Sequence, residues 1–274
     1  MGVGGSGLRT VGLSLSLFVV AAGAPAQVVP NRTIQYLHPT DVTDARALWV
    51  NPAGLGRLQE ASVHVDLTVG DPGASGRLRQ LTLGFDSRGF SFGYQRDVFN
   101  GGARGHTYRL GFAGGRQGLV AGVAAALYRG GTSGTGWDVG LLYDAAPGFT
   151  VGGVIENIRQ PVVRDSTLRA TYVPGATLRL FGARAAVSAH GRLTSDGVVG
   201  YAFGARTGFH EGTSLPIRVL ARLDTNRSLR RAILAIGLSL GDQDLAGAVA
   251  TTSADVARLD ALSVYGVSTR RLDR

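Results

Sequence analysis

The 274-residue sequence contains no cysteine, and all 28 of its basic residues are arginine, so lysine is absent as well. Without cysteine the chain can form no disulfide, and a cysteine-ligated metal site is excluded. After the first 26 residues, no stretch reaches the roughly 18 consecutive apolar residues that a membrane-spanning helix needs. No long segment shows helical periodicity either. The stability of the fold must therefore come from another source, such as a sheet that closes on itself.

The first 26 residues have the layout of a secretory signal peptide. They contain no acidic residue, carry one early charge at Arg9, and continue into an apolar run from Val11 to Ala22. The small-residue site Ala24-Pro25-Ala26 follows, which predicts cleavage before Gln27. The apolar run is too short for a transmembrane anchor. The pattern therefore predicts an exported protein with a signal peptide at residues 1–26.

From Ala61 onward, short segments alternate between apolar and polar residues. In Ala61–Val69 every odd position is apolar, whereas Ser62, His64, Asp66 and Thr68 take the even positions. Period 2 places these two sets on opposite faces of a strand. About 14 such strands are predicted, which is an even number as expected of a barrel. They are Ala61–Val69, Leu78–Asp86, Phe90–Arg96, Thr107–Phe112, Leu119–Arg129, Trp137–Asp144, Phe149–Ile158, Leu168–Phe181, Gly182–Leu193, Gly197–Gly208, Leu215–Leu223, Arg231–Leu240, Leu245–Thr252 and Ala261–Thr269.

Many of the apolar strand faces have an aromatic residue at their end. This feature distinguishes a membrane barrel from a soluble β-sandwich. Aromatics at strand ends are typical of the two interfacial girdles of a bilayer-spanning barrel, whereas a sandwich has longer and less regular connections. We therefore predict an all-β, closed antiparallel transmembrane β-barrel over residues 61–274, in a bacterial outer membrane. The outward-facing aromatics predicted from this pattern are Phe85, Phe90, Tyr94, Tyr108, Phe112, Tyr128, Trp137, Tyr143, Phe149, Tyr201 and Phe209.

Residues 27–60 do not alternate, and they predict a compact segment between the signal peptide and the barrel. Asp41–Trp49 favours a short helix, capped by Thr40 or Asp41 and ended by Pro52. The apolar side chains of this segment can pack only inside the barrel or at its rim. Two interpretations stay open: a plug that fills and stiffens the lumen, or a hatch that moves. The predicted hatch residues are Leu48, Trp49, Asn51, Pro52, Ala53, Gly54 and Leu55.

The run Asp44–Leu55, with Asn51-Pro52-Ala53-Gly54-Leu55 at its end, resembles the segment near the mature N-terminus of FadL-type outer-membrane proteins. That broad group includes the PorV- and PorQ-type barrels of the type IX secretion system. Val154–Ile158 and Leu215–Val219 are similar to two further strand motifs of the group. The resemblance implies a barrel of 14 strands with an N-terminal hatch. The chain departs from the group in its short length and in its C-terminal Arg274.

Charged residues of the parity opposite to the aromatics should face the lumen. Ionised groups there need water or partners, so we expect an arginine–carboxylate network. Such a network either solvates the wall or lines a permeation path, and excess arginine along a path would favour anionic solutes. The predicted lumen residues are Asp66, Arg109, Asp138, Asp144, Glu156, Arg179, Arg206, Arg218 and Arg222.

Catalytic and metal-binding constellations are not apparent in the sequence. The five histidines are scattered, and none lies in a recognisable nucleophile setting. Gly130–Gly136 looks superficially like a phosphate loop but lacks the ending Lys-Ser/Thr and a following helix. We therefore predict no enzyme, no cofactor and no metal.

A formal charge of +9 can indicate a protein that binds nucleic acid. Because the chain is predicted to be exported, anionic headgroups are the favoured partner instead. We therefore predict contact with outer-membrane lipid and no binding of nucleic acid. Three functions remain open. One is a FadL-like barrel that passes small hydrophobic or amphipathic molecules across the outer membrane, with such a molecule as its ligand. The second is a non-transporting accessory barrel, like PorV or PorQ, that docks a secretion-system protein. The third is a barrel with a purely structural role.

Overall fold

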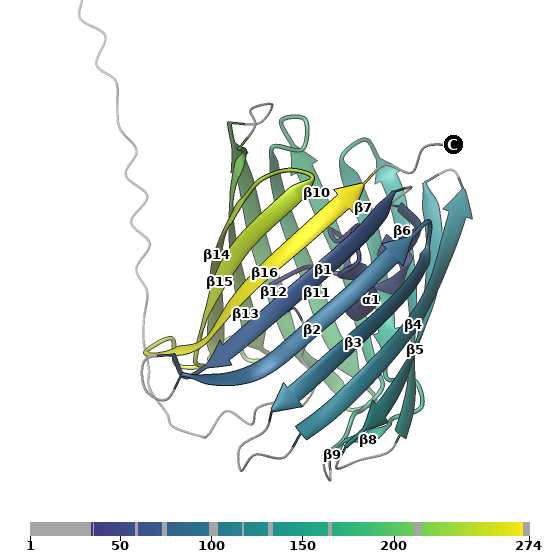
Figure 1. Cartoon of the computed structure of the whole chain (residues 1–274), viewed down its shortest axis with the longest axis vertical. Coiled ribbons are helices and arrows are strands. Elements are labelled where there is room, and N and C mark those ends of the chain that lie inside the picture. Colours follow the sequence, from purple (N-terminus) through teal and green to yellow (C-terminus); the bar gives the residue numbers. More distant parts are fainter. Residues whose placement is uncertain are drawn as a thin grey trace, which may run out of the picture.

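The computed structural model describes residue 34 and residues 36–57, 60–72, 76–98, 104–116, 118–130, 134–163, 166–210 and 215–270. Fourteen strands form one closed barrel in which every neighbouring pair is antiparallel, as the alternation predicted (Figure 1). The barrel closes where β1 pairs with β16, from Ala61 opposite Arg270 to Gly70 opposite Ala261. The predicted signal peptide and the first residues of the predicted hatch lie outside the described residues.

The strand bounds agree with the predicted strands to within a few residues at most ends. The first half of the barrel consists of β1 (Ala61–Gly70), β2 (Arg77–Ser87), β3 (Phe90–Val98), β4 (Arg104–Arg116), β5 (Leu119–Arg129), β6 (Gly134–Ala146) and β7 (Phe149–Glu156). The second half consists of β10 (Thr171–Leu180), β11 (Ala185–Thr194), β12 (Gly197–Phe209), β13 (Ile217–Asn226), β14 (Ala232–Leu240), β15 (Asp244–Thr252) and β16 (Leu259–Arg270).

The connection between β7 and β10 contains a small hairpin that the sequence did not predict. Its strands are β8 (Val162–Val163) and β9 (Ser166–Thr167), which pair only with each other. Val163 is buried and packs with Ala126 and Tyr128 of β5. The connection therefore folds back against the inner wall at the end of the barrel where β8 and β9 are labelled in Figure 1.

Inward and outward faces alternate along the strands. On β1, Val63 and Leu67 are more than 40% exposed, whereas His64 and Asp66 are 4% and 3% exposed. Outward-facing apolar side chains recur on the other strands, including Phe90, Phe92, Phe112, Trp137 and Tyr143. The outer face is therefore apolar and the inner face polar, the reverse of a water-soluble barrel.

Tyr128 corrects the predicted outward set, because it is 2% exposed and faces inward. It lies on β5, whose two faces are both apolar, so the sequence gives no parity there. Its ring instead packs against Val163 of the inward-folded connection.

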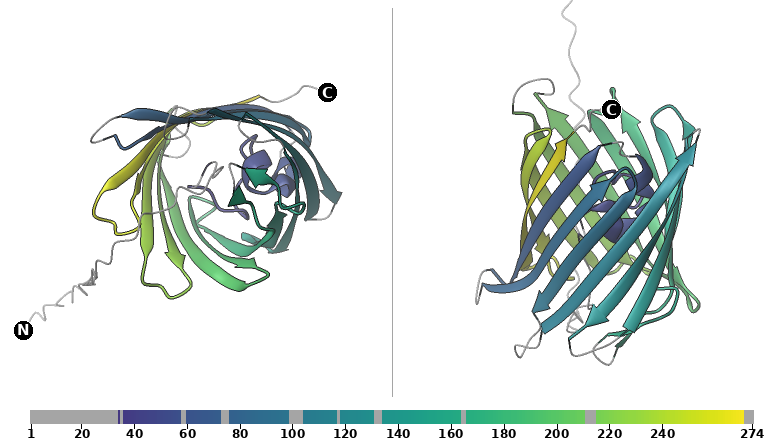
Figure 2. Two further views of the ribbon diagram at one scale, coloured as in Figure 1. Left: turned by 90° about the horizontal axis from the view of Figure 1, so that it is seen from below. Right: turned by 45° about the vertical axis from the view of Figure 1, so that its right-hand side comes forward.

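Residues 36–57 lie inside the barrel and are called here the N-terminal insert (Figure 2). They include the four-residue helix α1 (Ala47–Val50) and the 3-10 helix η1 (Pro52–Arg57). The insert contacts the inner faces of β3, β4, β5 and β6. Figure 2, seen from below, shows its purple coils against one side of the ring of strands.

The helix expected from Asp41 is shorter than predicted. Residues 41–46 form bends and turns, and α1 begins at Ala47 with no side-chain cap. The reason is that both carboxylate oxygens of Asp41 accept hydrogen bonds from arginines of the barrel wall, so neither caps a helix N-terminus.

Candidate functional site

The insert is seated on glycines that face the lumen from four successive strands. These are Gly93 on β3, Gly111 on β4, Gly122 on β5 and Gly140 on β6, all buried. A methyl group added at Gly93 would come within 2.6 Å of the Trp49 ring and 2.7 Å of Leu48. One added at Gly111 would lie 2.6 Å from Leu48 and 3.0 Å from Leu55. With a larger residue at either position, the side chains of the insert would have to move, so glycine lets the insert approach the wall this closely.

The other two glycines receive the Asn-Pro-Ala turn. A side chain at Gly122 would collide with the backbone of Pro52, and one at Gly140 with the Asn51 side chain. Within the insert, Gly54 has the same role, because a β-carbon there would meet Val42 and the Ala47 side chain. The sequence shows these glycines but not their purpose, since glycine inside a strand signals only a close approach of some kind.

Asn51 fixes the turn to the wall. It is fully buried, and its amide donates to the carbonyls of Pro39 at 2.9 Å and Gly153 at 3.4 Å. Its side-chain oxygen accepts from the Ala53 amide at 3.1 Å. One side chain thus joins two parts of the insert to β7, which gives a physical reason for asparagine before the proline.

Arg109 of β4 holds the helix of the insert from the wall. Its guanidinium donates to Asp138 on β6 at 2.6 Å and to the Leu48 carbonyl at 3.1 Å. It also lies 5.2 Å from the centre of the Trp49 ring, within cation–π range. The predicted residues Arg109, Asp138, Leu48 and Trp49 are therefore brought together at one point.

Asp41 of the insert anchors two further arginines that the sequence placed in the lumen. It accepts from Arg179 on β10 at 2.9 Å and from Arg206 on β12 at 2.6 Å. The neighbouring Thr40 hydroxyl lies 2.7 Å from that of Thr177. The sequence predicted these arginines as lumen residues but missed Asp41 as their partner, because its position suggested a helix cap.

Arg222 of β13 contacts the start of the insert and its own strand. It binds the Asp224 carboxylate with two hydrogen bonds of 2.8 Å and also donates to the Leu37 carbonyl. Beside it, the His38 and His190 rings meet with their Nδ1 atoms 3.0 Å apart. Sequence reasoning treated both histidines as scattered residues, and only the fold brings them together.

Asp66 of β1, four strands from β13 in the closed barrel, also meets the insert. The Tyr36 hydroxyl donates to it at 2.8 Å, and the Tyr36 ring stacks on Tyr265 of β16 at 5.0 Å. The Arg46 guanidinium lies 5.0 Å from the same Tyr265 ring. The insert is therefore held by polar and aromatic contacts to both halves of the wall.

Two of the predicted lumen residues lie at the end of the barrel opposite the β8–β9 hairpin, where the β6–β7 and β14–β15 turns are. Asp144 accepts from Arg57, the last residue of η1, and from Thr150. Arg218 binds Asp242 in the β14–β15 turn, where that carboxylate is largely exposed. Arg218 thus lies apart from the insert and its seat.

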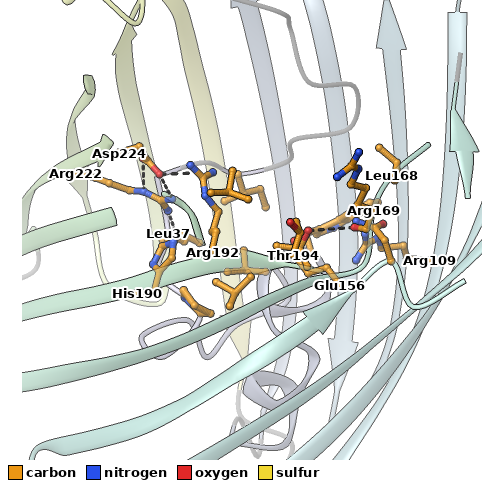
Figure 3. Close-up of a pocket in the computed structure, with 18 of the residues that line it drawn as sticks. Leu37, Arg109, Glu156, Leu168, Arg169, His190, Arg192, Thr194, Arg222 and Asp224 are labelled. Atoms are coloured by element: carbon orange, nitrogen blue, oxygen red, sulfur yellow. Dashed lines mark hydrogen bonds and ion pairs between the residues drawn. The ribbon is translucent and has the colours of Figure 1, made fainter. Parts of the chain in front are cut away.

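A cavity of about 290 Å³ lies between the insert and the inward-folded connection (Figure 3). Leu37 and Trp49 border it from the insert, and Leu168 and Arg169 from the connection. Three of the predicted lumen residues border it from the barrel wall: Arg109 of β4, Glu156 of β7 and Arg222 of β13. Strands β10, β11 and β13 contribute further side chains. These include Val173, His190, Arg192 and Asp224.

The wall is irregular beside this cavity. β10 and β11 pair at Tyr172 with Leu193 and again at Gly175 with His190, but not at Val173 or Pro174. Proline has no amide hydrogen and cannot donate to a ladder. On the facing strand β11, the register with β12 shifts between Arg192 and Leu193. The β10–β11 ladder is therefore interrupted where Val173 and Arg192 border the cavity.

The outer face identifies the environment of the barrel. Its exposed apolar side chains include tilted aromatic pairs, with ring centres 5.3 Å apart for both Phe90–Phe112 and Tyr94–Tyr108. A closed sheet satisfies all its backbone groups internally and leaves no edge in lipid. The protein is therefore an outer-membrane β-barrel that faces lipid with this surface.

Other site types find no support in the part of the chain that the structure describes. No helix there is long and apolar enough to cross a membrane. Nor do three or more histidine, aspartate or glutamate side chains of that part gather as they would around a metal ion.

Solved structures of similar fold are found at low sequence identity. The CymD monoaromatic hydrocarbon channel is 10% identical with a TM-score of 0.60, covering 87% of this chain and 95% of that one. The Ralstonia pickettii toluene transporter TbuX is 12% identical with a TM-score of 0.55, covering 84% and 94%. A Pseudomonas aeruginosa FadL homologue is 10% identical with a TM-score of 0.49, covering 84% and 93%. No protein-family model matches the sequence, and no curated protein matches it significantly.

Proposed function

We propose that this outer-membrane barrel passes small hydrophobic or amphipathic molecules, and that the N-terminal insert is the hatch that controls their passage. The observation that carries the proposal is the seat of four glycines. It fits the insert closely, yet it contributes no side chain that would lock the insert in place.

The contacts of the insert divide into a fitted part and a releasable part. The fitted part is apolar, with Leu48, Trp49 and Leu55 on the glycine seat. Burial of side chains of this size is worth about 1.5–3 kcal/mol each, which is enough to keep a short segment docked. The releasable part consists of the arginine contacts to Leu48 and Asp41, which water or a polar ligand can replace.

The cavity and the interrupted β10–β11 ladder complete a path for a solute through the barrel. A molecule that enters from the β8–β9 end meets the cavity first, with the insert beneath it. The Val173–Pro174 stretch pairs with β7 but not with β11. This interruption gives a lateral exit toward lipid, which suits a hydrophobic solute better than an aqueous pore would. Two similar folds are, by their names, a monoaromatic hydrocarbon channel and a toluene transporter, which supports this class of solute.

The alternative, an accessory barrel that docks a secretion-system protein, predicts a sealed lumen. A cavity beside the insert does not favour it.

Deletion of residues 40–55 tests the proposal. Cells that make the deletion protein should take up a hydrophobic dye such as N-phenylnaphthylamine faster than cells with the full chain, because the seat is then empty. Folding of the deletion protein is checked by its heat-modifiable migration in detergent gels. Unchanged uptake through a folded deletion barrel would contradict a gating role.

A further inference from the structure

Arg192 of β11 borders the cavity with hydrogen-bond donors that the protein does not use. Its Nε is buried and has no hydrogen-bond partner among the described residues. Its Nη1 lies 4.0 Å from the Asp224 carboxylate, too far for a hydrogen bond. The Arg192 side chain is only 18% exposed, so its guanidinium has lost much of its hydration, and these free donors have a cost unless something occupies them.

The carboxylate next to Arg192, that of Asp224, is already hydrogen-bonded to another arginine. Asp224 receives two hydrogen bonds of 2.8 Å from Arg222, a geometry that uses both carboxylate oxygens. Figure 3 shows the Arg192 and Arg222 guanidinium groups on either side of this one carboxylate. Two arginines therefore flank this carboxylate at this end of the cavity, and Glu156 is a second carboxylate on the same lining.

Apolar surface lies across the same cavity. Leu37 and Trp49 of the insert, Leu168 of the connection and Val173 of β10 all border it. Its volume of about 290 Å³ is at the lower limit of small-molecule pockets. Such a space holds one ring or a short chain and excludes a long acyl tail.

We propose that this cavity binds a compact organic acid, with its carboxylate on Arg192 and its apolar body against Leu168, Val173 and Trp49. The inference rests on the proposed channel function and names the solute class. A neutral hydrocarbon of the same size would fill the apolar part but leave Arg192 desolvated and unpaired. Among solutes of this size, the cavity therefore discriminates by charge.

The test uses two probes of nearly equal size, para-nitrobenzoate and para-nitrotoluene, which differ in a carboxylate. Both quench tryptophan fluorescence on contact. The chain has two tryptophans, and Trp137 lies on the outer face, so the Trp137→Phe variant reports from Trp49 at the cavity. Full-length protein in detergent is titrated with each probe, with and without the further change Arg192→Met.

We expect saturable quenching by para-nitrobenzoate, with a Kd that rises at least about tenfold in Arg192→Met, the loss typical of a charged hydrogen bond. Para-nitrotoluene should bind more weakly to the Arg192 protein, and its binding should not weaken in Arg192→Met. The control Arg79→Met removes an arginine that pairs with Asp260 away from the cavity and should leave both titrations unchanged.

Equal binding of the two probes, no saturable para-nitrobenzoate binding, or no effect of Arg192→Met would each overturn the inference. None of these results would overturn the channel itself. Uptake of an uncharged dye through the barrel depends on the insert and not on Arg192, so the two proposals fail separately.

Discussion

Each residue of the Asn51–Leu55 turn meets a particular feature of the wall or of the insert. Asn51 bonds the Pro39 and Gly153 carbonyls, Pro52 rests on Gly122, the Ala53 amide donates to the Asn51 side chain, and Leu55 rests on Gly111. Gly54 leaves room for Val42 and Ala47. A sequence motif of five residues is thus explained by one docked geometry.

Asn51→Ala tests this explanation at a single side chain. The substitution leaves the Pro39 carbonyl and the Ala53 amide buried without their partners, which should cost about 1–3 kcal/mol. Amide hydrogen exchange in residues 47–55 should accelerate by about tenfold or more, while exchange in the barrel strands stays slow. Asn226→Ala is the matched control, because Asn226 makes comparable bonds in an exposed turn. Equal exchange of the insert in all three proteins would contradict the assigned role.

At the scale of elements, the insert and the strands beneath it depend on each other. Gly111→Val places a branched side chain where Leu48 and Leu55 now lie, so the insert should be displaced while the strand itself, which favours valine, still forms. Dye uptake should rise toward that of the deletion protein.

Gly114→Val is the matched control for Gly111→Val. Gly114 lies on the same strand, β4, but it is exposed, and a β-carbon there would meet no atom within 4 Å. Uptake through this variant should equal that of the unchanged protein. The same rise in both variants would mean that any bulky residue in the wall raises permeability, and that the seat is not special.

The interruption beside Pro174 gives a second prediction about elements. Pro174→Thr supplies the missing amide donor, so β10 and β11 can pair through this stretch. If solutes leave laterally here, dye uptake should fall by several fold. Ala176→Thr changes an already paired position of the same strand and should leave uptake unchanged. Equal uptake by both variants would argue against a lateral exit.

How much the sequence could predict also differs between elements. The barrel could be predicted because period-2 alternation is a local pattern, which is already complete in residues 61–69 of β1. The hairpin of β8 and β9 has no such pattern. The inward position of Tyr128 was missed because β5 is apolar on both faces, so its alternation cannot be recognised in the sequence. Likewise Asp41 looks like a helix cap in sequence, and only the closed barrel brings it to Arg179 and Arg206. Contacts made across the lumen are set by closure, and no local pattern encodes them.

Across the whole molecule, the wall and its contents have different sources of stability. The wall contains no cysteine and relies on 14 paired strands and an apolar outer face. The insert relies on a glycine seat at one side and on arginine contacts at the other. A barrel built in this way can let its insert move without loss of its own fold, which is the central claim of the proposed function.

The most direct test locks the insert and asks whether passage stops. The Ala45 amide lies 3.3 Å from the Ser62 hydroxyl, and both residues are buried, so Ala45→Cys with Ser62→Cys should form a disulfide between insert and wall. The natural chain has no cysteine, so this bond is unique and a reductant has no other target in the protein. We predict that uptake of the hydrophobic dye is blocked when the pair is oxidised and returns to the level of the unchanged protein on reduction. Equal uptake in the oxidised and reduced states would contradict a moving insert.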